Sequence, residues 1–312
     1  DTVDGVNNVF LGGLAGYDGD NGDNNVFIGY AAGQNNAASN NTAVGYQALV
    51  SNTTGTDNVA VGANALDANT EGDRNTSIGY LSLGANTTAD NNTALGYAAL
   101  NVNTTGENNT GLGSGALVSN TTGASNTAVG KGALNASTTS NSNTAVGFDA
   151  LNDNTTGANN TAIGAGTLDK NTTGIQNTAL GSAALDANTT GDLNVAIGYH
   201  SLGSNVSTGA NTAVGGYALY VNEAANNTAM GYQSLYSNTS GTSNVAVGRE
   251  SLNQNTSADN NTAVGYRALF LSTTGANNTA VGRECLQANT TGASNTALGS
   301  TALDANTTGS FN

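Results

Sequence analysis

The sequence predicts an all-β protein, a parallel β-solenoid (β-roll) with about eighteen 17-residue coils and two short strands in each coil. The first observation is a glycine that recurs every 17 residues, with steps of 16 only at 29–45 and 215–231. The second is an asparagine four residues before each of these glycines, from Asn8 to Asn295. So short and regular a period is typical of stacked repeats in which each unit contacts its neighbours.

Each repeat follows the pattern N-T-A-V-G-Y-x-A-L-x-x-N-T-T-G-x-x, as in residues 41–57. Positions are counted from the central glycine, which is Gly45 in this copy. Thr42 at −3 and Val44 at −1 lie on one face of an extended strand, because side chains alternate, and we expect that face to point inward. Ala43 and Gly45 then form a bare outer face along which copies of the chain could pack.

A leucine at +4, in sixteen repeats from Leu49 to Leu303, is expected to lie on a second short strand as the other apolar wall. The N-T-T-G that follows is a turn sequence, because Asn and Gly tolerate positive φ. Identical residues of stacked coils should form ladders. The expected ladder residues of three successive coils are Asn41, Asn58, Asn75, Gly45, Gly62, Gly79, Leu49, Leu66 and Leu83.

The repeats differ in regularity along the chain. Residues 1–40 are expected to form degenerate N-terminal coils and a candidate cap, because Phe10 and Phe27 replace the alanine at −2. Residues 41–312 form the regular array. An all-helical solenoid is disfavoured, because Gly, Asn and Thr fill most of each repeat.

The net charge of −15, with 21 acidic and 6 basic residues, disfavours nucleic-acid and anionic membrane partners. No apolar run is long enough for membrane insertion. The single cysteine, Cys285, occupies a column of small residues and is interpreted as a packed side chain.

Four segments share a short motif, namely 24–30 (NNVFIGY), 58–64 (NVAVGAN), 194–200 (NVAIGYH) and 244–250 (NVAVGRE). They resemble the N-S-V-A-I-G signature of the YadA-like head repeats of trimeric autotransporter adhesins, and the longer repeat is similar to stretches of related trimeric fibre proteins. The resemblance implies a left-handed β-roll, a homotrimer and a bacterial cell-surface location. Two departures are the period, near 14 in that family, and Thr in place of the first Val.

Candidate chemistry is sparse. His200, the only histidine, lies in a variable outward column without a recurring acid pair, so we expect no enzyme and no catalytic residues. Asp18, Asp20 and Asp23 alternate with glycine in a manner that suggests a weak Ca²⁺ site, with a solvated acidic turn as the alternative. No other cofactor is expected.

Three recurrent polar features have competing interpretations. Tyrosines at +1 form a candidate surface binding stripe for sugars, or stack on one another; they are Tyr30, Tyr46, Tyr80, Tyr97, Tyr199, Tyr232 and Tyr266. The sequons at Asn52, Asn103, Asn154, Asn238 and Asn306 are either glycosylation sites or turn residues. Threonine doublets such as Thr53–Thr54 raise an ice-binding alternative, which adjacent rather than alternate spacing disfavours.

Together these patterns predict an extracellular structural or adhesive fibre segment, the head or shaft of a surface adhesin or filament. Its expected partners are copies of itself, in a homotrimer or filament, and host-surface or glycan ligands. The alternative is a phage-like tail fibre segment that binds surface glycans, and an ice-binding solenoid is a minor one.

Overall fold

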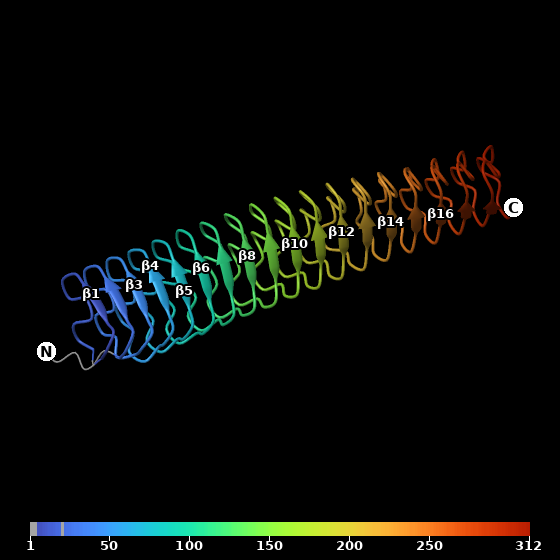
Figure 1. Cartoon of the computed structure of the whole chain (residues 1–312). Helices are drawn as coiled ribbons and strands as arrows, with labels where there is room; N and C mark the ends of the chain where they lie inside the picture. The colour runs from blue at the N-terminus through green and yellow to red at the C-terminus, as the bar shows by residue number, and fades with distance from the viewer. Residues whose placement is uncertain (1–4, 20–21) are drawn as a thin grey trace. The chain divides into compact units, whose positions relative to one another are not determined.

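The computed structural model describes residues 5–19 and 22–312, and it confirms the predicted all-β parallel solenoid with coils of about 17 residues. The chain divides into two compact units, Asp1–Ala158 and Asn159–Asn312. In each unit, successive coils stack so that their strands lie side by side (Figure 1). The described residues include no helix.

The described residues contain eighteen strands, one in each coil, and every strand is three residues long. In the first unit these are β1 (Val9–Leu11), β2 (Val26–Ile28), β3 (Thr42–Val44), β4 (Val59–Val61), β5 (Thr76–Ile78), β6 (Thr93–Leu95), β7 (Thr110–Leu112), β8 (Thr127–Val129) and β9 (Thr144–Val146). In the second they are β10 (Thr161–Ile163), β11 (Thr178–Leu180), β12 (Val195–Ile197), β13 (Thr212–Val214), β14 (Thr228–Met230), β15 (Val245–Val247), β16 (Thr262–Val264), β17 (Thr279–Val281) and β18 (Thr296–Leu298).

Neighbouring strands within a unit are parallel and in exact repeat register. Ala43 of β3 pairs with Ala60 of β4, and the flanking residues pair in the same way. Backbone hydrogen bonds between coils continue outside the strands, for example from the Leu49 amide to the Ala65 carbonyl at 3.0 Å. The turns are therefore paired ladders too, and most of each coil is fixed by its neighbours.

The expectation of two strands per coil is wrong in one respect, because the segment that carries the +4 leucine is a turn. Gln47 at +2 has φ 53° and Leu49 at +4 also has φ 53°, both in the left-handed region. This conformation costs on the order of 1–2 kcal/mol for a residue with a Cβ. Complete burial of the leucine, worth about 1.5–3 kcal/mol, offsets that cost.

The predicted orientation of the strand is also wrong, because the alanine and not its neighbours faces the core. Ala43 is fully buried, whereas Thr42 and Val44 on either side are partly exposed. The same pattern of burial recurs along the strands. The interior is narrow: the alanine at −2, the small residue at +3 and the leucine at +4 fill it together with two asparagines. A longer side chain at −2 would compete for the space of the leucine.

The first two coils show that the −2 and +4 side chains share one space. Here the strand supplies the large group, since Phe27 is fully buried and stacks on Phe10 with ring centroids 5.2 Å apart. The +4 positions hold Gly16 and Gly33 in place of leucine. A Cβ added to Gly33 would lie 2.6 Å from the Phe27 ring. In these two coils a phenylalanine at −2 and a glycine at +4 take the place of the alanine at −2 and the leucine at +4.

We predict that this exchange can be transferred to the third coil. Leu49→Gly alone should destabilise the protein by about 2–5 kcal/mol by leaving a cavity, and Ala43→Phe alone by about 1–3 kcal/mol by overpacking. The double variant should recover most of both losses, because the new ring would continue the Phe10–Phe27 stack. Thermal unfolding of all four proteins by circular dichroism measures this coupling, and simply additive losses would contradict the shared space.

The central glycines are required for a different reason. They adopt φ from 126° to 143°, and their backbones approach one another across the stack. A Cβ on Gly62 would lie 2.5 Å from the Gly79 carbonyl oxygen of the next coil. The recurring glycine therefore serves both the bend and the close contact between coils.

Gly62→Ala should lower stability by roughly 2–5 kcal/mol, through both left-handed strain and a backbone clash. Gly216→Ala is the matched control, since a Cβ there would make only ordinary contacts, the nearest with a Tyr232 ring carbon at 3.6 Å, and the backbone needs no positive φ. Melting temperatures of the two variants should differ clearly. Equal melting temperatures would remove the steric explanation for the repeat.

Candidate functional site

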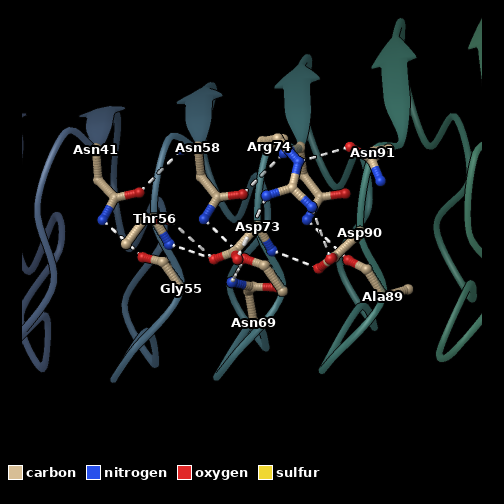
Figure 2. Close-up of polar contacts among 12 residues, drawn as sticks. Asn41, Gly55, Thr56, Asn58, Asn69, Asp73, Arg74, Ala89, Asp90 and Asn91 are labelled. Atoms are coloured by element: carbon tan, nitrogen blue, oxygen red, sulfur yellow. Dashed lines mark hydrogen bonds and ion pairs between the residues drawn. The ribbon is translucent and has the colours of Figure 1, made fainter.

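The asparagine at −4 forms a continuous buried ladder, as Figure 2 shows for Asn41 and Asn58. The Asn58 amide donates to Asn41 Oδ1 at 2.9 Å, and the Asn75 amide donates to Asn58 Oδ1 at the same distance. Within its own coil, Asn41 Nδ2 donates to the Gly55 carbonyl at 2.8 Å. Each side-chain amide thus joins two coils.

A second buried ladder is formed by the asparagines at +7. Asn69 Nδ2 donates to Asn52 Oδ1 of the preceding coil at 2.8 Å and to the Gly72 carbonyl at 3.0 Å. Asn58 Nδ2 from the first ladder also donates to the Gly72 carbonyl, at 2.8 Å. One carbonyl at +10 therefore accepts from two asparagines in this coil, and the pattern recurs in most others, as at Gly106 with Asn92 and Asn103. This accounts for the small residue at +10, because a Cβ at Gly55 would lie 2.6 Å from Asn52 Oδ1.

Burial of the second ladder changes the interpretation of the sequons. Asn52, Asn103, Asn154 and Asn238 are fully buried, and Asn306 in the last coil is partly exposed. Their Nδ2 atoms, to which a glycan would have to be attached, donate to the carbonyl at +10, as Asn103 does to Gly106 at 2.9 Å. In the folded coils these asparagines act as ladder residues.

The +7 ladder is interrupted where serine replaces asparagine, at Ser137 and Ser272. The Oδ1 atoms of the preceding asparagines, Asn120 and Asn255, are then buried without a hydrogen-bond partner. The Ser272 hydroxyl is likewise buried and unpartnered. A serine hydroxyl is too short to bridge to the next coil. These are local gaps in the +7 ladder.

Ser272→Asn should raise stability by about 1–2 kcal/mol, because the new Nδ2 could donate to Asn255 Oδ1 as in the other coils. Ser272→Ala provides the control that removes the unpaired hydroxyl without restoring the ladder. In urea or thermal unfolding, the Ser272→Asn variant should be more stable than both the Ser272→Ala variant and the wild type. If the asparagine variant were less stable than the alanine variant, the site would lack room for the longer side chain, and the proposed hydrogen bond to Asn255 Oδ1 would be contradicted.

Acidic side chains are arranged along the outside of the turns, where they bind backbone amides of the preceding coil (Figure 2). Asp73 Oδ1 accepts from the Thr56 amide at 2.7 Å, and Asp90 Oδ1 accepts from the Asp73 amide at 2.8 Å. Arg74 joins the same row through Asp90 Oδ2 at 2.9 Å and Asn91 Oδ1 at 2.7 Å. Some of the excess acidic side chains thus accept hydrogen bonds from backbone amides.

The predicted Ca²⁺ residues fall into this arrangement in part. Asp23 Oδ1 accepts from the Val6 amide at 2.9 Å, and Asp18 accepts from the Gln34 side chain. Asp20 lies outside the described residues. Within residues 5–19 and 22–312 no three His, Cys, Asp or Glu side chains converge as metal ligands. Calcium binding stays a prediction.

The threonine doublets have a role in the ladders as well. Thr53 Oγ1 donates to the Thr70 carbonyl at 2.9 Å, and Thr104 Oγ1 does the same to Thr121 at 3.0 Å. The first hydroxyl of each doublet is therefore used between coils, and ice binding is left without a specific supporting contact.

The +1 tyrosines are outward, and most are about half exposed. In the first unit they occur as separate stacked pairs, Tyr30 with Tyr46 and Tyr80 with Tyr97, each with ring centroids 5.8 Å apart. In the second unit Tyr199 and Tyr232 belong to a larger group that the sequence did not reveal. We call it the aromatic edge; it comprises Tyr199, His200, Tyr217, Tyr220, Tyr232 and Tyr236.

The aromatic edge is built from positions +1, +2 and +5 of three successive coils, those of β12, β13 and β14. Tyr217 lies at its centre, 5.4 Å from Tyr199 and 5.5 Å from Tyr220 between ring centroids. Tyr220 stacks on Tyr236 at 5.4 Å and His200 packs on Tyr199 at 4.3 Å. Desolvation among the rings, with the neighbouring Tyr199, raises the pKa of the Tyr217 phenol.

A charged network occupies the same positions in the next two coils, those of β15 and β16. Arg267 donates from Nε to Glu250 at 2.6 Å, and Arg249 binds the other carboxylate oxygen at 2.9 Å. The hydrogen bond from Arg267, assisted by Arg249, holds the pKa of the Glu250 carboxyl below its usual range. The Arg267 guanidinium also lies over Tyr266 and Phe270, at 5.3 and 4.8 Å from the ring centroids. Tyr266 is thus the one stripe residue that packs mainly against cations.

The sheet face is the second candidate surface. It consists of the outward side chains at −3 and −1 of the strands, and no strand residue is charged. Leu95, Leu180 and Met230 on this face are 46%, 43% and 45% exposed. The bare Ala/Gly docking face expected from the sequence is not exposed, since Ala43 and its equivalents point inward. The outward face is instead a row of aliphatic and threonine side chains.

The remaining candidates for chemistry are held in structural positions. Cys285 is fully buried, its thiol donates to the Ala297 carbonyl at 3.3 Å, and burial raises the pKa of the thiol. His200 belongs to the aromatic edge. The described residues enclose no pocket. They also contain no helix of the length and apolarity that spanning a membrane requires.

Comparison with protein-family models gave no match for this chain, and comparison with curated proteins gave none either.

Proposed function

We propose that the chain is a segment of an extracellular structural or adhesive fibre, and that it acts without catalysis by associating with copies of itself. The sheet face is the observation that carries this proposal. Its uncharged row of aliphatic and threonine side chains, with Leu95, Leu180 and Met230 more than 40% exposed, resembles the uncharged core of a protein interface. The resemblance to trimeric adhesin heads supports a homotrimer and a cell-surface location, with a filament as the other assembly.

The area of the face is adequate for such an interface. Each unit has nine strands with two outward side chains apiece. At roughly 40 Å² for each partly exposed side chain, one unit offers about 700 Å², close to the share of one partner in a standard interface. The pitch of the side-chain rows is the same in every copy, so two such faces can interdigitate along their length.

The charge distribution favours the same surface. A chain of net charge −15 repels its copies, and contact is least unfavourable where no charge lies. The acidic rows lie in the turns, as at Asp73 and Asp90, and not on the strands. Depletion of charge is also a feature of interface cores.

The test is the oligomeric state of Val129→Lys/Val281→Lys, which places one charge on the sheet face of each unit. Thr122→Lys/Thr274→Lys adds the same charge at exposed turn positions and serves as the control. By light scattering after size exclusion, the wild type and control should be oligomers and the Val→Lys protein should dissociate at least about tenfold more readily, because two lysines would lose water in the interface. A folded, monomeric wild type would refute self-association.

A further inference from the structure

The aromatic edge differs from the rest of the chain in composition, and this difference needs an explanation beyond folding. In most other coils the positions equivalent to Tyr217 and Tyr220 hold small or polar residues, such as Ala98 and Asn101, and no other coil has an aromatic residue at both. Those coils stack with the same register. The rings are therefore not required for the solenoid, and their exposed parts are surface that the coil does not use.

We propose that the aromatic edge binds a linear, uncharged polysaccharide that runs along the stack of coils. Tyrosine offers an apolar ring face, on which the C–H face of a sugar can stack, and a hydroxyl that can bond to sugar hydroxyls. The proposal goes beyond the fibre function, since it assigns a ligand class to one defined surface.

The spacing of the rings fits a repeating polymer. Tyr217 at +2 meets the Tyr199 ring at +1 of the preceding coil edge-on, at 5.4 Å, whereas Tyr220 and Tyr236 both occupy +5 of adjacent coils and stack with their centroids 5.4 Å apart. This separation follows the coil pitch of about 4.7–4.9 Å, which is close to the length of one pyranose residue in an extended chain. A polymer parallel to the stack would therefore present a similar group to each successive coil.

Glycines keep the edge low and open. A Cβ at Gly203 would lie 2.9 Å from the Tyr220 ring, and one at Gly216 would lie 3.6 Å from the Tyr232 ring. Besides their contacts with one another, the Tyr220 and Tyr232 rings thus lie over bare backbone of the preceding coil. Tyr199 and Tyr232 remain 51% and 46% exposed. With no pocket among the described residues, many shallow contacts along a polymer are the binding mode that this surface permits.

The negative charge of the chain favours an uncharged ligand over a polyanion. The chain as a whole carries −15, which repels polyanions. The carboxylate that follows the edge, that of Glu250, is already bound by Arg249 and Arg267 and attracts cations poorly. Tyrosine phenols are protonated at neutral pH, so those of the edge can donate hydrogen bonds to an uncharged ligand.

The experiment is affinity gel electrophoresis of the full chain through gels that contain hydroxyethyl cellulose, galactomannan or the polyanion polygalacturonate. The test variant is Tyr217→Ala/Tyr220→Asn/Tyr236→Asn, which installs residues found at these positions in other coils and leaves the net charge unchanged. The control is Tyr80→Ala/Tyr97→Ala, which removes a stacked pair from the first unit. Circular dichroism and light scattering accompany each protein.

At least one neutral polysaccharide should retard the wild type and the control. The test variant should bind it at least about tenfold more weakly, because stacking contacts are lost. Absence of retardation by both neutral polymers, unchanged retardation of the folded test variant, or equal retardation by polygalacturonate would overturn the proposal. The oligomeric state should be unchanged by the tyrosine substitutions, so failure here is distinguishable from failure of self-association.

Discussion

Two buried side-chain amides that donate to one backbone carbonyl hold most coils closed, and the rest of the structure depends on this arrangement. Asn58 and Asn69 meet at the Gly72 carbonyl, and their Oδ1 atoms accept from the neighbouring coil. A buried amide without partners would cost about 1–3 kcal/mol. Each amide is satisfied by a carbonyl of its own coil together with the equivalent residue one coil away, through that residue's backbone N–H in the −4 ladder and its side chain in the +7 ladder, so the interior favours the same asparagine in coil after coil.

The two 16-residue coils show that the asparagine positions are kept even where the length of the coil changes. Where one residue is missing, both asparagines are kept and the accepting carbonyl moves one residue closer. Asn36 donates to the Ala38 carbonyl at 2.6 Å, and Asn222 donates to the Ala224 carbonyl at 2.7 Å. Asn25 still reaches the same Ala38 carbonyl at 2.9 Å. The period can therefore vary in the turn but not in the positions that close the coil.

The fold class could be predicted because the period of the repeat and its turn residues can be recognised in the sequence alone. The strand orientation could not be predicted from alternation alone, since three residues place either Ala43 or its neighbours inward with equal regularity. The deciding signal lay elsewhere in the chain. Phe27 with Gly33, against Ala43 with Leu49, is an exchange of volume between −2 and +4 that is expected only if both positions share the core. The single strand likewise depends on left-handed leucines, a conformation that residue type does not suggest.

The aromatic edge was predicted only in part, because the +1 tyrosines were visible as a column while their neighbours at +2 and +5 were not. The left-handed residues at +2 and +4 fold the chain so that these positions lie together on the outside of the bend. The interior admits almost no variation, since asparagine, glycine, leucine and small residues are each fixed by a contact within the coil or between coils. Chemistry specific to this chain is therefore confined to a few outward columns. Tyr220, Tyr236 and Phe270 occupy one such column, whereas Asp67 and Asn101 are typical of it elsewhere. A departure from the repeat at a position that the fold leaves free is the feature that most strongly indicates a role outside the fold.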